Sequence, residues 1–140
     1  SFSLLEIIIA IVLISIVISF AIPKFTKTDE KVNITKLKSQ VALIRSAISN
    51  QKNKNILLSN SEKIDILDDS TVDKKDEKLF SKFVDFSIIS TDSSEKKVGS
   101  WAKISSNSYV FYLAYDFVSF SLEDENFVCK SKIELCSEVE

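Results

Sequence analysis

The stretch SFSLLEIIIAIVLISIVISFAI, residues 1–22, is one apolar run that carries a single charged side chain, Glu6. A run of about 20 apolar residues is long enough to cross the hydrocarbon core of a bilayer as a helix. A carboxylate inside such a run costs free energy unless it has a partner, so Glu6 predicts a functional contact. The stretch therefore predicts a subunit that is held in a membrane and then packs against copies of itself.

The composition limits what the rest of the chain does. Its 140 residues suffice for one modest domain, and the apolar run leaves roughly 85 to 110 residues for a globular part. The net charge of −2 does not favour nucleic acid or an anionic membrane surface as a partner. The chain has no histidine, so the commonest general base and metal ligand are both missing. We therefore expect a protein that is not an enzyme, with no catalytic, cofactor-binding or metal-binding residues.

Two sequence signals disagree about which side of a membrane the globular part occupies. The apolar run lacks the basic start and small-residue cleavage site of a secretory signal, and it continues into Lys24, Lys27 and Lys31. By the positive-inside rule, these lysines place the globular part in the cytoplasm. The closely spaced pair Cys129 and Cys136 predicts a disulfide, which favours an exported domain; the alternative is two unrelated reduced thiols.

A family resemblance decides between these signals. Residues 2–25, FSLLEIIIAIVLISIVISFAIPKF, resemble the N-terminal signature of type IV pilins and the related pseudopilins. That signature has an initial Phe, a small polar residue, two apolar residues, a Glu, a long apolar stretch, and a Pro before a basic or aromatic residue. The residues in register with it are Phe2, Ser3, Leu4, Leu5, Glu6 and Pro23. The resemblance implies that the globular part lies outside the cell.

The resemblance also implies a role for the first residues. In the family, the acid corresponding to Glu6 meets the terminal amine of a neighbouring subunit as the filament grows. Two opposite charges in an apolar core attract strongly, and each alone is costly, so the pair fixes the axial register. The family leader is cut just before the initial Phe, so the amine belongs either to Ser1 or to Phe2. Because the sequence begins at Ser1, we expect a processed chain that starts there.

The apolar run is expected to be helical with one loosened stretch. Ser15 stands where the family usually has Gly, and Ser19 follows one turn later. Both hydroxyls can bond back to the helix, and Pro23 lacks the amide hydrogen that a continuous helix needs. We expect helix to about Ser15, a partly melted stretch to about Pro23, and helix again beyond it.

The chain is expected to divide into a membrane and filament-core segment, residues 1–33, and a globular head, residues 34–140. The helix is expected to continue through residues 34–54, because apolar residues there repeat at helical spacing and form one stripe. The stripe consists of Ile34, Leu37, Val41, Ile44 and Ile48. Residues 55–98 are expected to connect helix and sheet, with a solvated acidic loop and a short helix near 74–83. The acidic spacing does not fit an EF-hand calcium loop.

Residues 99–140 are expected to form an antiparallel sheet and a C-terminal loop. Alternating apolar residues predict three or four strands that pack on the helical stripe, with their aromatic side chains in the core. Asp116 either breaks this pattern or lies within a continuous strand. The pilin resemblance implies that Cys136 returns to Cys129 and ties the C-terminal segment to the sheet. The predicted fold is therefore α+β, of the type IV pilin kind.

The predicted function is structural. The resemblance implies a subunit of a type IV pilus used for adhesion, twitching motility or DNA uptake. The implied partners are many copies of the chain, the bacterial inner membrane that holds a single-pass pool, the prepilin peptidase and the pilus assembly machinery. The assembled product would be extracellular, and no cofactor is expected. Two alternatives stay open: a pseudopilin of a type II secretion or competence system, and a single-pass membrane-anchored binding domain. Glu6 and the cysteine pair favour the pilus.

Overall fold

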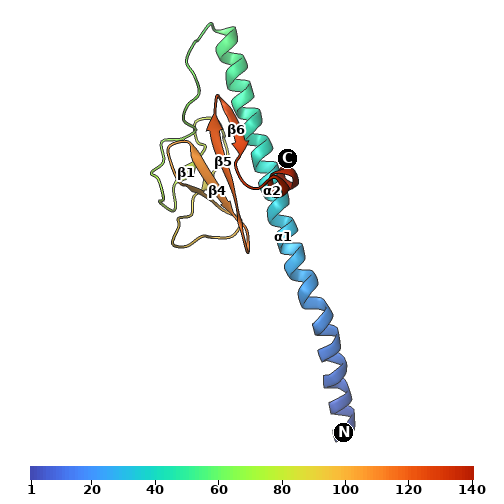
Figure 1. Cartoon of the computed structure of the whole chain (residues 1–140). Helices are drawn as coiled ribbons and strands as arrows, with labels where there is room; N and C mark the ends of the chain where they lie inside the picture. The colour runs from blue at the N-terminus through green and yellow to red at the C-terminus, as the bar shows by residue number, and fades with distance from the viewer. The chain divides into compact units, whose positions relative to one another are not determined.

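The computed structural model describes residues 1–140, except for the side chains of residues 21–29. The chain forms two compact units, Ser1–Val32 and Asn33–Glu140. Helix α1, Leu4–Leu57, contributes its first part to the N-terminal unit and its second part to the C-terminal unit (Figure 1). We call the C-terminal unit, Asn33–Glu140, the head.

The described part of the N-terminal unit is helical where a loosened stretch was expected. Ser15 Oγ donates to Ile11 O at 2.8 Å, and Ser19 Oγ donates to Ser15 O at 2.8 Å, within an unbroken α1. In a single chain no neighbour replaces the backbone hydrogen bonds that melting would break, so the helix keeps them. The single chain is therefore helical over the described residues up to Phe20, and melting of the segment once it is packed in a filament stays a prediction. The side chain of Pro23 lies outside the described residues.

The head contains the second part of α1, and its apolar stripe is buried as predicted. Leu37, Val41, Ile44 and Ile48 are 0–3% exposed and belong to one hydrophobic core. Each position lies three or four residues from the next, so all four side chains project from one face of the helix. The helix extends past the expected end at residue 54, and its last turn is closed by Asn60 N donating to Asn55 O at 2.8 Å.

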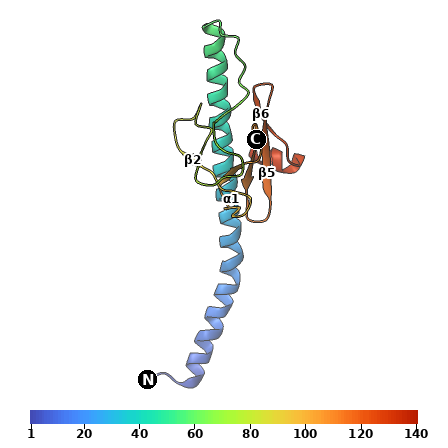
Figure 2. The ribbon, with the colours of Figure 1, turned by 90° about the vertical axis from the view of Figure 1, so that its left-hand side faces the viewer.

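A four-stranded antiparallel sheet lies alongside this part of α1 in both ribbon views (Figures 1 and 2). Its strands, in the order β3-β4-β5-β6, are β3 (Trp101–Lys103), β4 (Ser108–Tyr112), β5 (Phe117–Glu123) and β6 (Asn126–Cys129). Asp116 lies in the turn between β4 and β5, where its carbonyl oxygen accepts from Leu113 N at 2.8 Å. The α+β class and the predicted sheet are confirmed, and Asp116 breaks the strand.

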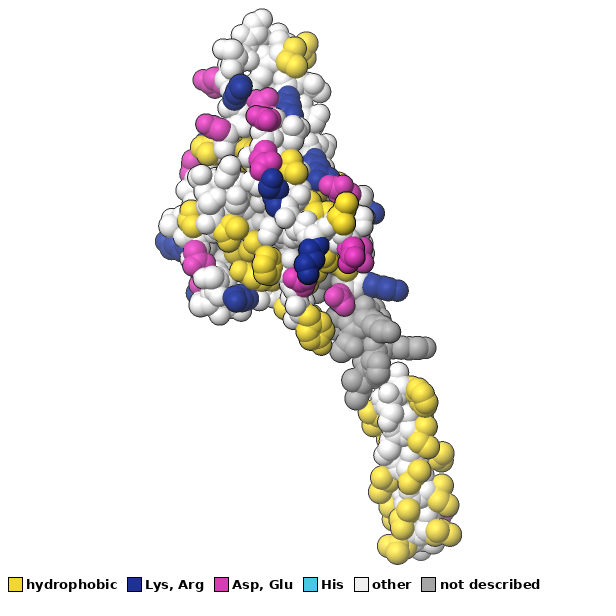
Figure 3. Space-filling model, in the orientation of Figure 1, with side chains coloured by type: hydrophobic (Ala, Val, Ile, Leu, Met, Phe, Trp, Pro, Cys, Tyr) yellow, Lys and Arg dark blue, Asp and Glu magenta, His cyan; other side chains and the backbone are white. Residues whose placement is uncertain are grey.

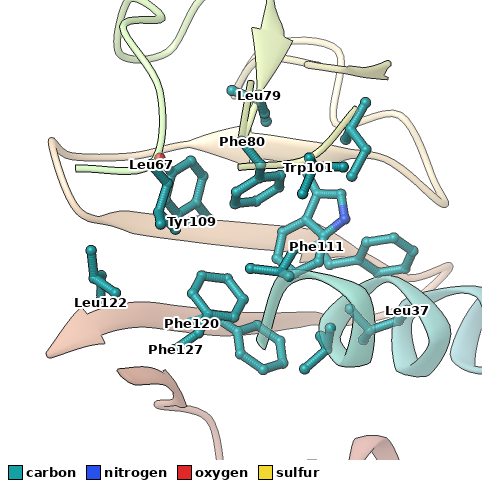
Figure 4. Close-up of a cluster of buried hydrophobic side chains, with 14 of the residues drawn as sticks. Leu37, Leu67, Leu79, Phe80, Trp101, Tyr109, Phe111, Phe120, Leu122 and Phe127 are labelled. Atoms are coloured by element: carbon teal, nitrogen blue, oxygen red, sulfur yellow. The ribbon is translucent and has the colours of Figure 1, made fainter. Parts of the chain in front are cut away.

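The centre of the head is aromatic. Phe80, Trp101, Tyr109 and Phe120 are each at most 1% exposed, and Phe127 stacks on Phe120 with ring centroids 5.1 Å apart. Figure 4 shows these rings gathered in one cluster over the strands, with Leu37 of α1 near them. Aromatic rings bury more apolar area than other side chains and gain from edge-to-face packing. The strand aromatics thus form the core, as predicted.

The connecting segment differs from prediction. Residues 74–83 contain strand β1 (Lys78–Leu79), paired antiparallel with β2 (Ile88–Ile89), instead of the expected short helix. Asp76 and Phe80 have φ values of 62° and 57°, which a right-handed helix does not accommodate. The direction of the apolar side chains was nevertheless predicted well, because Leu79 and Phe80 are buried and Phe83 is partly buried against the core.

The C-terminal segment ends in a helix that the sequence did not predict, α2 (Ile133–Val139). Val139 is buried, and Arg45 of α1 donates to Phe127 O at 3.0 Å and pairs with Glu140 at 3.1 Å. Seven residues are too few for a helix that is stable alone, so packing on the head maintains it. The last residues are therefore part of the head and not a loose tail.

A left-handed residue gives a first testable prediction. Lys96 is exposed and has a φ of 47°, at the end of a turn in which its N–H donates to Asp92 O at 2.9 Å. A side chain at positive φ is strained, whereas glycine is not, so Lys96→Gly should raise the free energy of unfolding by about 0.5 kcal/mol. Urea denaturation measures the change. The control is Lys97→Gly, at a position without positive φ, which should lower stability; equal effects of the two changes would contradict the prediction.

Candidate functional site

The described residues of the N-terminal unit expose apolar side chains on every side of α1. From Leu4 to Phe20, the large apolar side chains are 49–79% exposed. Figure 3 shows them around the narrow described part of this unit, whereas charged side chains are scattered over the visible face of the head. Soluble monomers rarely expose contiguous apolar surface on this scale, and large patches mark sites of interaction with a protein or a membrane. This segment is the candidate functional site.

Glu6 lies in the first turn of α1 and forms a reciprocal cap with Ser3. Ser3 N donates to Glu6 Oε2 at 3.3 Å, and Glu6 N donates to Ser3 Oγ at 3.3 Å. This arrangement is a capping box, which satisfies two backbone donors at the start of a helix. A carboxylate in the first turn also interacts favourably with the helix dipole. The hydrogen bonds with Ser3 thus position the Glu6 carboxylate at the N-terminal end of α1.

The capping role of Ser3 was missed at the sequence level. The signal was present, because Ser3 and Glu6 have the Ser-x-x-Glu spacing that precedes apolar helices. Ser1 and Phe2 lie before the helix and are exposed. The ion pairs of the described residues do not include one between the amine of Ser1 and Glu6. Within the described part of one chain, therefore, no ion pair joins the terminal amine to Glu6, and the predicted pair with a neighbouring subunit stays a prediction.

No helix, taken over the residues whose side chains are described, is both long and apolar enough to cross a membrane.

The C-terminal cysteines form the predicted disulfide. Cys129 ends β6 and Cys136 lies in α2, with their Cα atoms 5.8 Å apart. The bond closes a short loop between the last strand and the last helix, and it holds α2 against the sheet. A covalent link in such a loop limits local opening of the C-terminal segment, where proteolysis is otherwise most frequent.

A buried charged cluster lies in the head, where a solvated acidic loop was expected. Asp68 is 2% exposed, and its Oδ1 accepts from Lys103 Nζ at 2.7 Å; Lys103 is 5% exposed. The other carboxylate oxygen, Oδ2, accepts from Tyr109 Oη at 2.7 Å and from Phe80 N at 3.0 Å. The expectation of a solvated loop is therefore wrong for Asp68. Sequence reasoning had no signal for this cluster, because its members are far apart in the chain.

The hydrogen bonds of this cluster shift the pKa of two groups. Burial raises the pKa of Asp68, but the bonds from Lys103, Phe80 N and Tyr109 outweigh burial and leave that pKa below its ordinary value. Burial, followed by the adjacent Asp68 carboxylate, raises the pKa of Tyr109. Asp68 is therefore held ionised and Tyr109 protonated. All polar side-chain atoms buried among the described residues have a partner, which indicates a structural cluster.

Other acidic side chains of the connecting segment are also used within the head. Asp69 pairs with Lys82 at 3.4 Å, and Asp73 accepts from Ser93 Oγ at 2.6 Å. Within the described part of the chain, no group of three or more His, Cys, Asp or Glu side chains could hold a metal ion.

A groove of about 440 Å³ lies between α1 and β6. Arg45 lines it and donates hydrogen bonds to Phe127 O and to Glu140 Oε1.

Comparison of the chain with models of protein families, with curated proteins and with solved structures gives no match.

Proposed function

We propose that this chain is a structural subunit of a type IV pilus-like filament, and that its apolar N-terminal segment forms the filament core. The observation that carries the proposal is the exposed apolar surface from Leu4 to Phe20 with Glu6 at its start. Burial of each large apolar side chain contributes roughly 1.5–3 kcal/mol, so many such residues favour association strongly. Copies of the same segment supply apolar surface of matching length, which makes self-assembly the simplest way to bury it.

Glu6 supports assembly in a defined register. Inside an apolar filament core, the carboxylate needs a positive partner, and the terminal amine of a neighbouring copy carries the opposite charge at the same end of the chain. The capping bond occupies Oε2, and a carboxylate has a second oxygen that can accept from that amine. The cap therefore orients Glu6 without consuming its acceptors. A misplaced copy leaves the charge unpaired, which opposes the wrong register.

The chain occupies two cellular locations in turn, one before and one after assembly. Before assembly, the apolar segment rests in the bacterial inner membrane, where a prepilin peptidase and an assembly machinery act on it. After assembly, the head lies outside the cell, where the Cys129–Cys136 disulfide persists in oxidising surroundings. The role is structural and not enzymatic. Electron microscopy of sheared cell-surface material tests this: thin fibres made of this chain support it, and finding the chain only in the envelope refutes it.

A set of three variants tests the role of Glu6. Glu6→Gln keeps an oxygen that can accept from Ser3 N but removes the charge, and it should reduce filament yield at least about tenfold. Glu6→Ala removes both and should reduce filament yield at least as much. Membrane insertion should remain intact in both, because removing a charge from an apolar segment does not oppose insertion.

The control for these variants is Ser3→Ala, which removes the hydroxyl of the cap and keeps the carboxylate. Loss of one cap costs about 1 kcal/mol of helix stability, so this variant should still form filaments in amounts close to the unmodified chain. Sheared filaments and membrane-bound chain are both quantified by immunoblotting. Normal filament yield from Glu6→Gln would contradict the role of the charge, and failure of Ser3→Ala alone would assign the contribution of Glu6 to capping.

A further inference from the structure

Among the exposed apolar side chains of the head, two groups lie at chain turns and each forms a surface. The first, which we call the tip surface, consists of Lys54, Ile56, Leu57 and Leu58 at the end of α1; its three apolar side chains are 68–84% exposed. The helix end is hydrogen-bonded, because Leu58 N donates to Lys54 O at 3.0 Å. The exposure therefore belongs to a formed helix end. A run of consecutive exposed apolar residues is unfavourable in a monomer unless it has a use.

The second, which we call the base surface, consists of Tyr115, Asp116 and Phe117 at the turn from β4 to β5. Tyr115 is 89% exposed and Phe117 is 50% exposed. The turn is ordered by Asp116, whose backbone oxygen accepts from Leu113 N and whose Oδ1 accepts from Phe117 N at 2.8 Å. Two aromatic rings are thus exposed at a hydrogen-bonded turn.

The two surfaces lie at opposite ends of the head. At the base, Tyr112 O accepts from Gly99 N at 2.7 Å, and Gly99 O accepts from Lys36 Nζ at 2.8 Å. At the other end, Lys52 Nζ donates to Asn126 Oδ1 at 3.0 Å. Lys36 and Lys52 are separated by roughly 24 Å along α1, from the rise of an α-helix.

Strand β5 spans the same distance between the two ends. It pairs Phe117 with Tyr112 near the base and Glu123 with Asn126 near the tip. Its length is roughly 20 Å from the rise of an antiparallel strand, which agrees with the separation along α1. Figure 1 shows the turn between β4 and β5 at one end of the head and the end of α1 at the other.

We infer that the tip surface of one copy binds the base surface of the next copy, head to tail. This inference rests on the proposed filament, in which identical parallel subunits meet along the axis with opposite ends facing each other. Both surfaces consist mainly of apolar side chains, and each includes one exposed charged residue. The tip surface includes the positive Lys54, and the base surface includes the negative Asp116. Neither residue takes part in the ion pairs of the described residues. Apolar contact with opposite charges at the rim favours this pairing over tip to tip or base to base.

A contact of this kind propagates without closing. A heterologous contact between opposite ends leaves one tip and one base unoccupied at the two ends of any row, so further copies add indefinitely. The N-terminal segments then hold copies together in the filament core, and the head contacts hold them together along its outside. The same lattice is thereby fixed at two places on each subunit.

Disulfide cross-linking of full-length chains, both in sheared filaments and in the unassembled membrane fraction, tests the inference. The double variant Leu57→Cys with Tyr115→Cys places one thiol at each end, too far apart to join within one chain. Mild oxidation should give a ladder of dimers, trimers and longer species on a non-reducing gel. The matched control is Leu57→Cys with Ile133→Cys, because Ile133 is 84% exposed, as Leu57 is, but lies on α2. The control should give at least about tenfold less ladder.

A charge exchange provides an independent measurement. Lys54→Glu alone and Asp116→Lys alone should each lower filament yield about twofold to fivefold, as expected for an exposed ion pair. The double variant should restore the yield, which a folding defect at the β4–β5 turn would not do. Thermal unfolding of each variant, followed by Trp101 fluorescence, shows whether the head remains folded.

The outcomes separate this inference from the proposed function. Filaments without a specific ladder, or single charge changes with no effect, overturn the inference and leave the filament standing. A specific ladder from chains that form no filaments supports the head contact and refutes assembly through the N-terminal segment. If phosphatidylcholine vesicles protect the Tyr115→Cys thiol from a water-soluble maleimide and no ladder forms, the base surface binds lipid and the inference is overturned.

Discussion

Asp68→Ala lowers the free energy of unfolding of the head by about 3–5 kcal/mol, the range for removing one partner of a buried ion pair. The change leaves the ammonium of Lys103 in the core with Ser70 O, at 3.0 Å, as its remaining partner. It also removes the acceptor of Tyr109 Oη and Phe80 N. Uncompensated charge and unpaired polar groups each cost free energy in a low-dielectric interior. Urea denaturation followed by Trp101 fluorescence measures the loss.

The matched control is Asp69→Ala at the next residue. The side chain of Asp69 is 82% exposed and pairs with Lys82 at 3.4 Å on the surface. An exposed ion pair contributes under about 1 kcal/mol, so this variant should remain close to the unmodified chain. Similar losses of unfolding free energy in the two alanine variants would show that the buried ion pair does not stabilise the head more than the exposed one.

A double-mutant cycle isolates the ion pair. Asp68→Asn keeps the shape of the side chain and removes its charge, and Lys103→Met removes the ammonium but keeps most of the volume. In the Asn background, Lys103→Met should cost less than in the unmodified chain, with a coupling energy of about 1–3 kcal/mol. Additive costs would contradict a direct interaction between Asp68 and Lys103.

The same cluster predicts how stability depends on pH. Because the pKa of Asp68 is lowered by folding, its contribution is present above the unfolded value of about 4 and is lost as the pH falls through the folded value. Because the pKa of Tyr109 is raised by folding, its contribution is present below the unfolded value of about 10 and declines as the pH rises above it. In Asp68→Ala, the acid dependence should be flatter than in the unmodified head.

The sequence predicted the elements that have a regular apolar period. Leu37, Val41, Ile44 and Ile48 repeat at helical spacing, and their burial follows from that spacing alone. The strands of the four-stranded sheet were predicted for the same reason, because their side chains alternate. Residues 74–83 have apolar side chains compatible with a short helix. The positive φ values at Asp76 and Phe80 break such a helix. Phe80 N donates to Asp68 Oδ2 and Asp76 N donates to Ser90 O, and both partners lie outside the local sequence.

The candidate site divides in a similar way. The apolar segment and Glu6 are local features, so the sequence identified them directly. The Ser3–Glu6 cap also has a local signature, the Ser-x-x-Glu spacing, so the sequence alone is sufficient to predict it. The tip and base surfaces could not be predicted, because their exposure depends on which apolar residues the sheet leaves uncovered. Leu57 and Ile48 have similar side chains, and only the fold makes one 84% and the other 3% exposed.

Trp101→Ala should lower the free energy of unfolding by about 3–5 kcal/mol, the cost of truncating a large buried aromatic side chain. Trp101 is 1% exposed, and its ring lies against Phe80, Phe111, Phe120 and Phe127 at centroid distances of 5.3–6.0 Å. Its Nε1 donates to Gln40 Oε1 of α1 at 2.9 Å. One side chain thus joins the sheet, the connecting segment and the helix. Because the variant lacks the only tryptophan, circular dichroism during urea denaturation measures its stability.

Trp101→Phe separates packing from the hydrogen bond to α1. Phenylalanine keeps much of the aromatic contact and removes the donor to Gln40, so this variant should lose about 1–2 kcal/mol, well below the loss in Trp101→Ala. Adding Gln40→Leu to Trp101→Phe removes the amide that was left without its partner, and should recover part of the loss. If Trp101→Phe were as destabilising as Trp101→Ala, the bond to Gln40 would outweigh the aromatic packing. If Trp101→Ala left stability unchanged, the aromatic cluster would not hold the sheet against α1, because a well-packed core cannot lose its largest buried side chain without cost.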